Sequence, residues 1–231
     1  MTISGCRMEA LPAPVRTRND AELRRSLRFA SCFIYAPRGV GLLAVSARLL
    51  CQRAKASDPL WLPRYAGYVA ELSVRDRLFQ GIFARDALLV PVPGSAHACT
   101  ARWAAWQLAM AFRELGLARA VWVGLDRQFP VRKSATAPTG ERPTVWQHYD
   151  SLAVSSVPTP RPQKVVLIDD VITKGRTLLA AATRLACVLP NADVRAFALI
   201  RTLGFLERVD RLFAPCEGLV HWSGGDARRE P

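Results

Sequence analysis

The fold of this chain is decided by the stretch VVLIDDVITKGRT, which runs from Val165 to Thr177. It begins with four aliphatic residues, Val165 to Ile168, an unbroken apolar run that is typical of a strand buried on both faces of a parallel sheet. Two carboxylates, Asp169 and Asp170, follow where we expect this strand to end. In open α/β sheets, ligands bind at the carboxyl ends of the strands. The stretch therefore predicts a strand that delivers two acidic side chains to a binding site.

A short loop with hydroxyl groups and one glycine follows the acidic pair and leads into a helix expected over 177–188. A glycine that allows close approach, hydroxyl groups and the free N–H groups of a helix N-terminus together bind a phosphate group well. The predicted phosphate ligands are Thr173, Lys174, Gly175, Arg176 and Thr177. The acidic pair suits two hydroxyls, or hydroxyls plus a metal ion, so a phosphorylated sugar with a vicinal diol fits both halves. The simpler alternative is that the aspartates only cap the helix, for which one would be enough.

The rest of the chain alternates between strand and helix patterns. We expect further strands at 31–35, 87–92, 120–123 and 194–200, helices at 42–54, 72–85 and 100–115, and a proline-containing loop at 57–66. This alternation predicts an α/β fold, a parallel sheet flanked by helices, with an N-terminal cap region. The expected division is an N-terminal tail (1–30), a helical hood (31–86), an α/β core (87–205) and a C-terminal tail (206–231).

The composition indicates a protein with a sizeable core and a net charge that attracts anions, but it does not identify the ligand. Half of the 231 residues are hydrophobic, which supports a sizeable core, and no apolar stretch reaches the roughly 20 residues of a membrane-spanning helix. The 32 Lys and Arg against 19 Asp and Glu give a net charge of +13, which attracts anions such as nucleic acids or phosphorylated small molecules. The basic residues are spread along the chain, which weakens the nucleic-acid interpretation. Without a secretory signal, a C-x-x-C pair or another cluster of metal ligands, we expect a cytoplasmic protein with no metal site of its own.

The stretch 165–177 resembles the motif that binds phosphoribosyl pyrophosphate (PRPP) in type I phosphoribosyltransferases. It departs from that motif at Lys174, where a small hydroxyl residue is usual. The resemblance implies the type I phosphoribosyltransferase fold, with Asp169 and Asp170 on the ribose 2′- and 3′-hydroxyls and residues 173–177 on the 5′-phosphate. It also implies Mg²⁺ bound through PRPP, and transfer of phosphoribose to an unidentified nitrogenous base with release of pyrophosphate. Asp169 and Asp170 are the predicted catalytic residues, since carboxylates stabilise a cationic transition state and Asp170 is a candidate general base.

A second segment resembles the competence-associated, ComF-like branch of this family. Val90-Pro91-Val92-Pro93 matches its V-P-V-P strand end, and residues 126–148, with several prolines and basic residues, loosely follow its flexible loop. The four-cysteine zinc module and the R-G-F-N motif of that branch are absent. The resemblance assigns the pyrophosphate side to five residues: Ser95, Arg102, Arg127, Lys133 and Arg142. For His148, also in this loop, a structural role is favoured over a catalytic one.

Two alternatives to an enzyme stay open. The departures near Arg102 and at Lys174 are compatible with a protein that binds PRPP without turnover. The net positive charge and the link of ComF-like proteins to DNA uptake are compatible with a nucleic-acid-handling protein. The acceptor base is not readable from the sequence, and a homodimer is neither indicated nor excluded.

Overall fold

The computed structural model describes residues 23–75, 79–96, 103–132, 141–204 and 208–231. Its centre is a seven-stranded sheet with the spatial order β3-β2-β6-β7-β1-β8-β9. The strands, in that order, are β3 (Ala120–Val121), β2 (Leu88–Pro91), β6 (Lys164–Ile172), β7 (Asp193–Thr202), β1 (Ser26–Tyr35), β8 (Phe213–Ser223) and β9 (Asp226–Glu230). The first five run parallel, and β8 and β9 are antiparallel additions at one edge. This arrangement confirms the predicted α/β fold with a parallel sheet.

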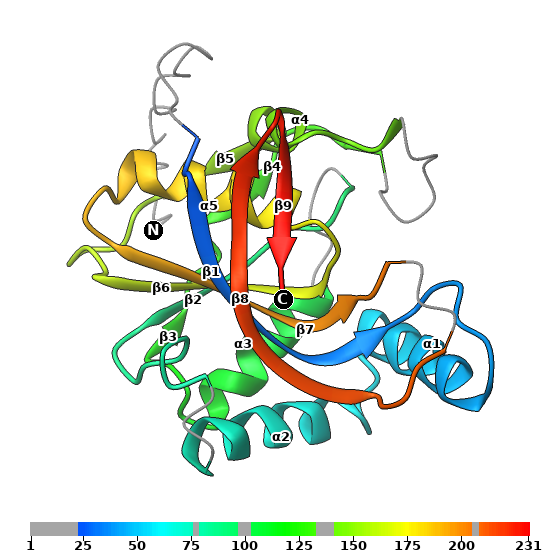
Figure 1. Cartoon of the computed structure of the whole chain (residues 1–231). Helices are drawn as coiled ribbons and strands as arrows, with labels where there is room; N and C mark the ends of the chain where they lie inside the picture. Colours follow the sequence, from blue (N-terminus) through cyan, green and yellow to red (C-terminus); the bar gives the residue numbers. More distant parts are fainter. Residues whose placement is uncertain (1–22, 76–78, 97–102, 133–140, 205–207) are drawn as a thin grey trace, which may run out of the picture.

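Helices cover both faces of this sheet (Figure 1). One face carries α5 (Arg176–Val188) and α4 (Val145–Ser151), with the small β4–β5 ribbon, whose strands are Leu125–Arg127 and Leu152–Val154. The other face carries α2 (Leu62–Arg75) and α3 (Ala104–Glu114), while α1 (Leu42–Lys55) lies beside the ends of β1 and β7. Strand β6 faces both layers: Val165 and Leu167 belong to the core on the α5 side, and Val166 and Ile168 to the core on the α2 side. The prediction of a strand buried on both faces is therefore confirmed.

The C-terminal segment differs from its prediction. Residues 206–231 were expected to be a tail, but β8 pairs along β1 and β9 pairs along β8. The turn between them is Gly224-Gly225, with φ of 59° and 83°, the positive values that a two-residue hairpin requires. The two adjacent glycines thus join two strands and do not mark a peripheral end.

Two N-terminal boundaries also differ. Strand β1 starts at Ser26, within the expected 1–30 tail, because Leu27 and Phe29 are buried while Arg28 between them stays exposed. Its place between β7 and β8 makes it part of the main sheet and not of a separate hood. Helix α2 covers 62–75, where a loop was expected at 57–66 and a helix at 72–85. Pro63 lies in the first turn of α2, where a proline displaces no intrahelical hydrogen bond.

Candidate functional site

The acidic pair lies on β6 at the point where its neighbour ends. Strand β6 continues to Ile172, so Asp169 and Asp170 are inside the strand and not after it. On one side β6 stays paired with β7 as far as Ile172, and on the other β2 ends opposite Ile168, with a last bond from Val92 N–H to the Ile168 carbonyl. The pair therefore occupies the carboxyl edge of the sheet beside the segment that follows β2, which is where open α/β sheets bind ligands.

The two carboxylates have different partners. Asp169 Oδ1 accepts a hydrogen bond from the Asp170 main-chain N–H at 2.9 Å. Asp170 Oδ2 accepts one from Lys55 Nζ, at the end of α1, at 2.8 Å. Burial, together with the charge of Asp170, raises the pKa of the Asp169 carboxyl well above its usual value. Lys55 is a site residue that the sequence did not reveal, because 115 positions separate it from Asp170.

The loop after β6, predicted to bind a phosphate and called the phosphate loop below (residues 173–177), turns sharply into α5 at Gly175. Gly175 caps α5 in the left-handed conformation, with φ of 82°, and a Cβ at this position would lie 2.5 Å from Val220 Cγ2. Thr173 and Lys174 are exposed, and the first turn of a helix leaves N–H groups without intrahelical acceptors. The structure thus brings the predicted residues 173–177 together around one helix N-terminus, three residues beyond the acidic pair.

Asp226 of β9 binds both basic side chains of this loop. It contacts Lys174 Nζ at 3.0 Å and pairs with Arg176 through both carboxylate oxygens, at 2.6 Å each. Partial burial alone raises the pKa of Asp226, but the hydrogen bonds from Arg176 and Lys174 outweigh it and lower this pKa to about 2. Arg176 also donates to the carbonyls of Pro143 and Arg142. The Arg176 side chain is thereby engaged with protein groups, and the predicted phosphate role rests on the main-chain N–H groups of the loop.

His148 of α4 lies against the end of the phosphate loop. Its Nε2 is 3.4 Å from Thr177 Oγ1, and its Nδ1 has no hydrogen-bond partner among the described residues. The side chain is buried, and this burial, reinforced by the nearby Arg127 and Arg176, lowers its pKa to about 3. His148 is therefore a neutral imidazole at physiological pH, a state suited to supporting Thr177.

Arg127 differs from its prediction as a residue of a mobile loop. It is buried at the end of β4, and its guanidinium donates to the carbonyls of Pro93 and Gly94 and to Ser151 Oγ. These hydrogen bonds fix the turn that follows the V-P-V-P segment. Arg127 therefore holds the main chain of this turn in position.

Two further contacts hold the same turn. Trp103 Nε1 donates to the Val92 carbonyl at 2.8 Å, and Val131 N–H donates to the Ser95 carbonyl at 2.9 Å. Of the other residues predicted for the pyrophosphate side, Arg142 contributes its carbonyl to Arg176, and Arg102 and Lys133 lie outside the described residues.

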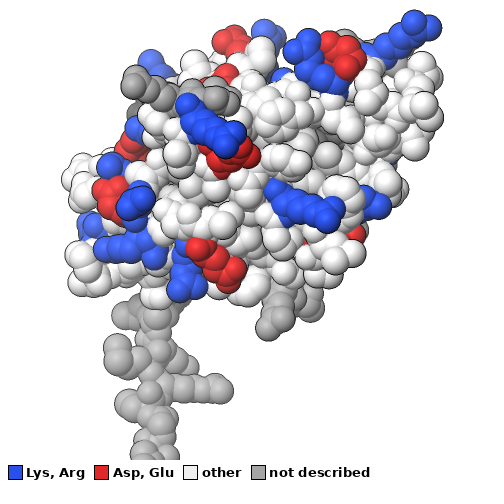
Figure 2. Space-filling view, turned by 90° about the horizontal axis from the view of Figure 1, so that it is seen from below, with Lys and Arg blue, Asp and Glu red and all other residues white. Residues whose placement is uncertain are grey.

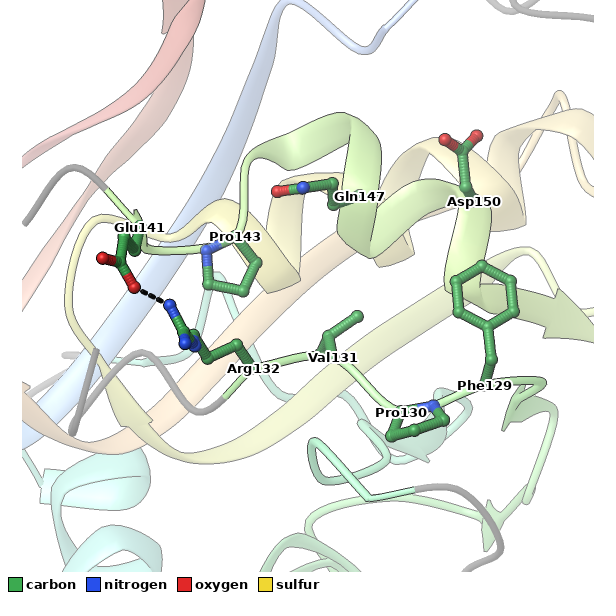
Figure 3. A pocket seen from close by; sticks show the side chains of 8 residues that line it. All are labelled: Phe129, Pro130, Val131, Arg132, Glu141, Pro143, Gln147 and Asp150. Carbon is green, nitrogen blue, oxygen red and sulfur yellow. Dashed lines mark ion pairs between the residues drawn. The ribbon is translucent and has the colours of Figure 1, made fainter. Parts of the chain in front are cut away.

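A cavity of about 270 Å³ opens between residues 129–132 and the stretch 141–150, which includes Gln147 and Asp150 of α4 (Figure 3). Arg132 and Glu141, which form an ion pair, lie at its end on either side of the segment 133–140. Pro143 lines the same cavity, and its carbonyl binds Arg176 of the phosphate loop. Pro143 therefore links this cavity to the loop that precedes α5.

The described residues contain no group of three or more His, Cys, Asp or Glu close enough to hold a metal ion. Two adjacent carboxylates suit Mg²⁺ only in company with substrate oxygens and water, which is how this ion is commonly held beside phosphates. None of the described helices is both long and apolar enough to cross a membrane.

Comparison with known proteins gives partial matches, and no family model matches the chain. A stretch of 60 residues, 26% of this chain, is 43% identical to an adenine phosphoribosyltransferase of Rhodospirillum centenum and covers 34% of it. The chain thus spans about a third of the length of this relative. Among solved structures, a purine phosphoribosyltransferase from Pyrococcus horikoshii has 14% identity and a TM-score of 0.32, over 66% of this chain and 93% of that one. A hypoxanthine phosphoribosyltransferase from Staphylococcus aureus has 11% identity and a TM-score of 0.32, over 64% and 69%.

Proposed function

We propose that this chain is a type I phosphoribosyltransferase that binds PRPP and transfers its phosphoribosyl group to a nitrogenous base. The observation that carries the proposal is the acidic pair on β6, followed after four residues by a left-handed glycine that caps α5. The 60-residue match to an adenine phosphoribosyltransferase supports it. Membership in the ComF-like branch is the narrower form of the same proposal and rests on the V-P-V-P segment.

In this proposal the two halves of the site divide the substrate between them. The carboxylates of Asp169 and Asp170 accept hydrogen bonds from the ribose 2′- and 3′-hydroxyls. The N–H groups of residues 173–177 and the hydroxyls of Thr173 and Thr177 bind the 5′-phosphate at the N-terminus of α5. Asp226 draws the long basic side chains of the loop toward β9, which leaves the main chain to make the phosphate contacts.

The reaction breaks the bond between ribose C1 and the pyrophosphate oxygen and forms a bond from C1 to a nitrogen of the base, whose proton passes to solvent. Positive charge develops on the ribose ring and negative charge on the departing pyrophosphate. The nearby carboxylates stabilise the positive charge on the ribose. Main-chain N–H groups in the turn after β2 stabilise the negative charge on the pyrophosphate, and Arg127 and Trp103 hold this turn in place. Mg²⁺ bound to PRPP would neutralise part of the pyrophosphate charge.

The test is a double variant, Asp169→Asn with Asp170→Asn, whose PRPP affinity is measured by calorimetry in the presence of Mg²⁺. We expect a loss of at least about 100-fold, because the diol loses two carboxyl groups as hydrogen-bond partners. The matched control is Asp86→Asn with Asp193→Asn. It removes the same two charges beside the other end of β6, where Asp86 pairs with Lys164 and Asp193 lies opposite it. Equal PRPP affinity in the double variant and the wild type would refute the assignment.

Turnover is a separate measurement from binding. Release of pyrophosphate from PRPP in the presence of a panel of purine and pyrimidine bases identifies the acceptor. Tight PRPP binding without pyrophosphate release from any base would instead favour the non-catalytic alternative.

A further inference from the structure

Lys55 ends α1 and reaches across to the acidic pair on β6. Buried residues on α1 follow a helical stripe, Ala44, Ala47, Cys51 and Ala54, and Lys55 adjoins this stripe at its C-terminal end. The last two residues of this stripe, Cys51 and Ala54, pack in the α2-side core, to which Val166 and Ile168 of β6 also belong. Asp170 follows Ile168 on that side of the strand, because side chains two apart share a face. The packing of α1 therefore aims the Lys55 ammonium at Asp170.

The Lys55–Asp170 contact is sheltered on its aspartate side. Nζ and Oδ2 are 2.8 Å apart, and the Asp170 side chain is 20% exposed while that of Lys55 is 51% exposed. Burial alone lowers the pKa of Lys55, but the charge of Asp170 and the hydrogen bond to it outweigh this and raise the pKa. Lys55 is therefore a permanent positive charge next to two adjacent carboxylates.

The charge balance of the site calls for a positive charge beside the acidic pair, and Lys55 carries one. PRPP carries a phosphate and a pyrophosphate, so a pair of aspartates repels it unless their charge is offset. The basic side chains of the phosphate loop do not supply this offset alone, because Asp226 is paired with Lys174 and Arg176. Lys55 is the basic side chain with a described hydrogen bond to the acidic pair.

Building on the proposed function, we propose that Lys55 is a substrate-binding residue that offsets the charge of the acidic pair when PRPP binds. The Asp170 carboxylate keeps its oxygens available to the ribose diol, while the ammonium lowers the repulsion that the phosphate groups meet. Mg²⁺ acts on the same repulsion from the side of the substrate. Lys55 and Mg²⁺ therefore partly replace each other in PRPP binding.

The experiment measures PRPP affinity by calorimetry, at low and at saturating Mg²⁺, for the wild type, Lys55→Met, Lys55→Gln and Lys55→Arg. We expect the two neutral variants to lose about 10- to 100-fold in affinity at low Mg²⁺. At saturating Mg²⁺ this loss shrinks, and Lys55→Arg keeps most of the affinity because it keeps the charge. A merely structural role predicts a loss that does not depend on Mg²⁺.

The matched control is Lys164→Met, which breaks the Lys164–Asp86 ion pair at the opposite end of β6. It removes the same charge and should leave PRPP affinity within about twofold of the wild type at both Mg²⁺ levels. Melting temperatures and circular dichroism of all variants show whether they fold alike.

The outcomes separate this inference from the proposed function. If the wild type does not bind PRPP, the proposed function fails whatever Lys55 does. If the wild type binds PRPP but Lys55→Met binds it equally or more tightly at every Mg²⁺ level, the role of Lys55 is refuted and the proposed function stands.

Discussion

His148, which is buried beside the phosphate loop, makes the stability of the folded chain depend on pH. His148 has an ordinary pKa of 6.5 that burial, Arg127 and Arg176 lower to about 3 in the folded chain. Above pH 6.5 it is mostly neutral in both folded and unfolded chains, so it adds little to the pH dependence of the unfolding free energy. As the pH falls from 6.5 toward 3, the unfolded chain takes up a proton that the folded chain refuses, so stability is lost over this window.

This linkage predicts that His148 destabilises the protein by about 2 kcal/mol at pH 4.5 relative to pH 7. Chemical denaturation at both pH values checks it, with His148→Gln as the comparison, because glutamine does not titrate. Asp169 acts in the opposite direction, since its raised pKa favours proton uptake by the folded chain at acid pH. It is present in both proteins and cancels from the difference. An equal fall in stability for wild type and His148→Gln would show that His148 is not the group responsible.

Among the secondary-structure elements, the turn from β6 into α5 depends on a single residue, Gly175. Gly175→Ala adds a Cβ at φ of 82° and 2.5 Å from Val220 of β8. The left-handed conformation costs about 1 to 2 kcal/mol and the crowding about 1 to 3 kcal/mol, so we expect a total loss of about 3 kcal/mol in unfolding free energy. PRPP affinity should fall as well, because the phosphate loop has to move.

The matched control for this change is Gly67→Ala on α2. Apart from the backbone of its own helix, no atom lies within 4 Å of its added Cβ, and alanine favours a helix interior by up to about 1 kcal/mol. Urea denaturation should therefore show a lower unfolding free energy than the wild type for Gly175→Ala and a higher one for Gly67→Ala. A Gly175→Ala protein as stable as the wild type, with unchanged PRPP affinity, would contradict the fit of this turn against β8.

Elements with strong local signals were predictable from the sequence. The aliphatic run Val165–Ile168 has the composition of a doubly buried strand, and the structure places it in the middle of the sheet. Strands β8 and β9 were missed because β8 is only partly buried along most of its length and includes Pro215, so it lacks a clear apolar pattern. Helix α2 was shifted because Pro63 signals a break in sequence but occupies a first turn in the structure.

The partners of the site residues were less predictable than the residues themselves. The acidic pair and the phosphate loop are contiguous in sequence, and a local pattern exposes them. Lys55 and Asp226 reach that segment from α1 and β9, across 115 and 52 positions in sequence. Only the packing of the sheet brings them there, and a single sequence carries no local signal for such contacts.

At the scale of the whole molecule, the positive charge is distributed rather than gathered on the face that is visible in Figure 2. Basic and acidic side chains are interspersed there, over a chain with a net charge of +13. A polyanion such as DNA gains most from a continuous basic surface, whereas a small phosphorylated ligand needs only a local site. The local site that we propose is the carboxyl edge of the sheet, where Lys55 of α1 contacts β6 beside the N-terminus of α5.

A crystal structure of the protein with PRPP and Mg²⁺ would locate the substrate on the sheet directly. We expect the 5′-phosphate within hydrogen-bond distance of the main-chain N–H groups of residues 173–177, and the ribose diol on the carboxylates of Asp169 and Asp170. A PRPP molecule bound elsewhere on the sheet, with the acidic pair still engaged only by protein groups, would contradict this expectation.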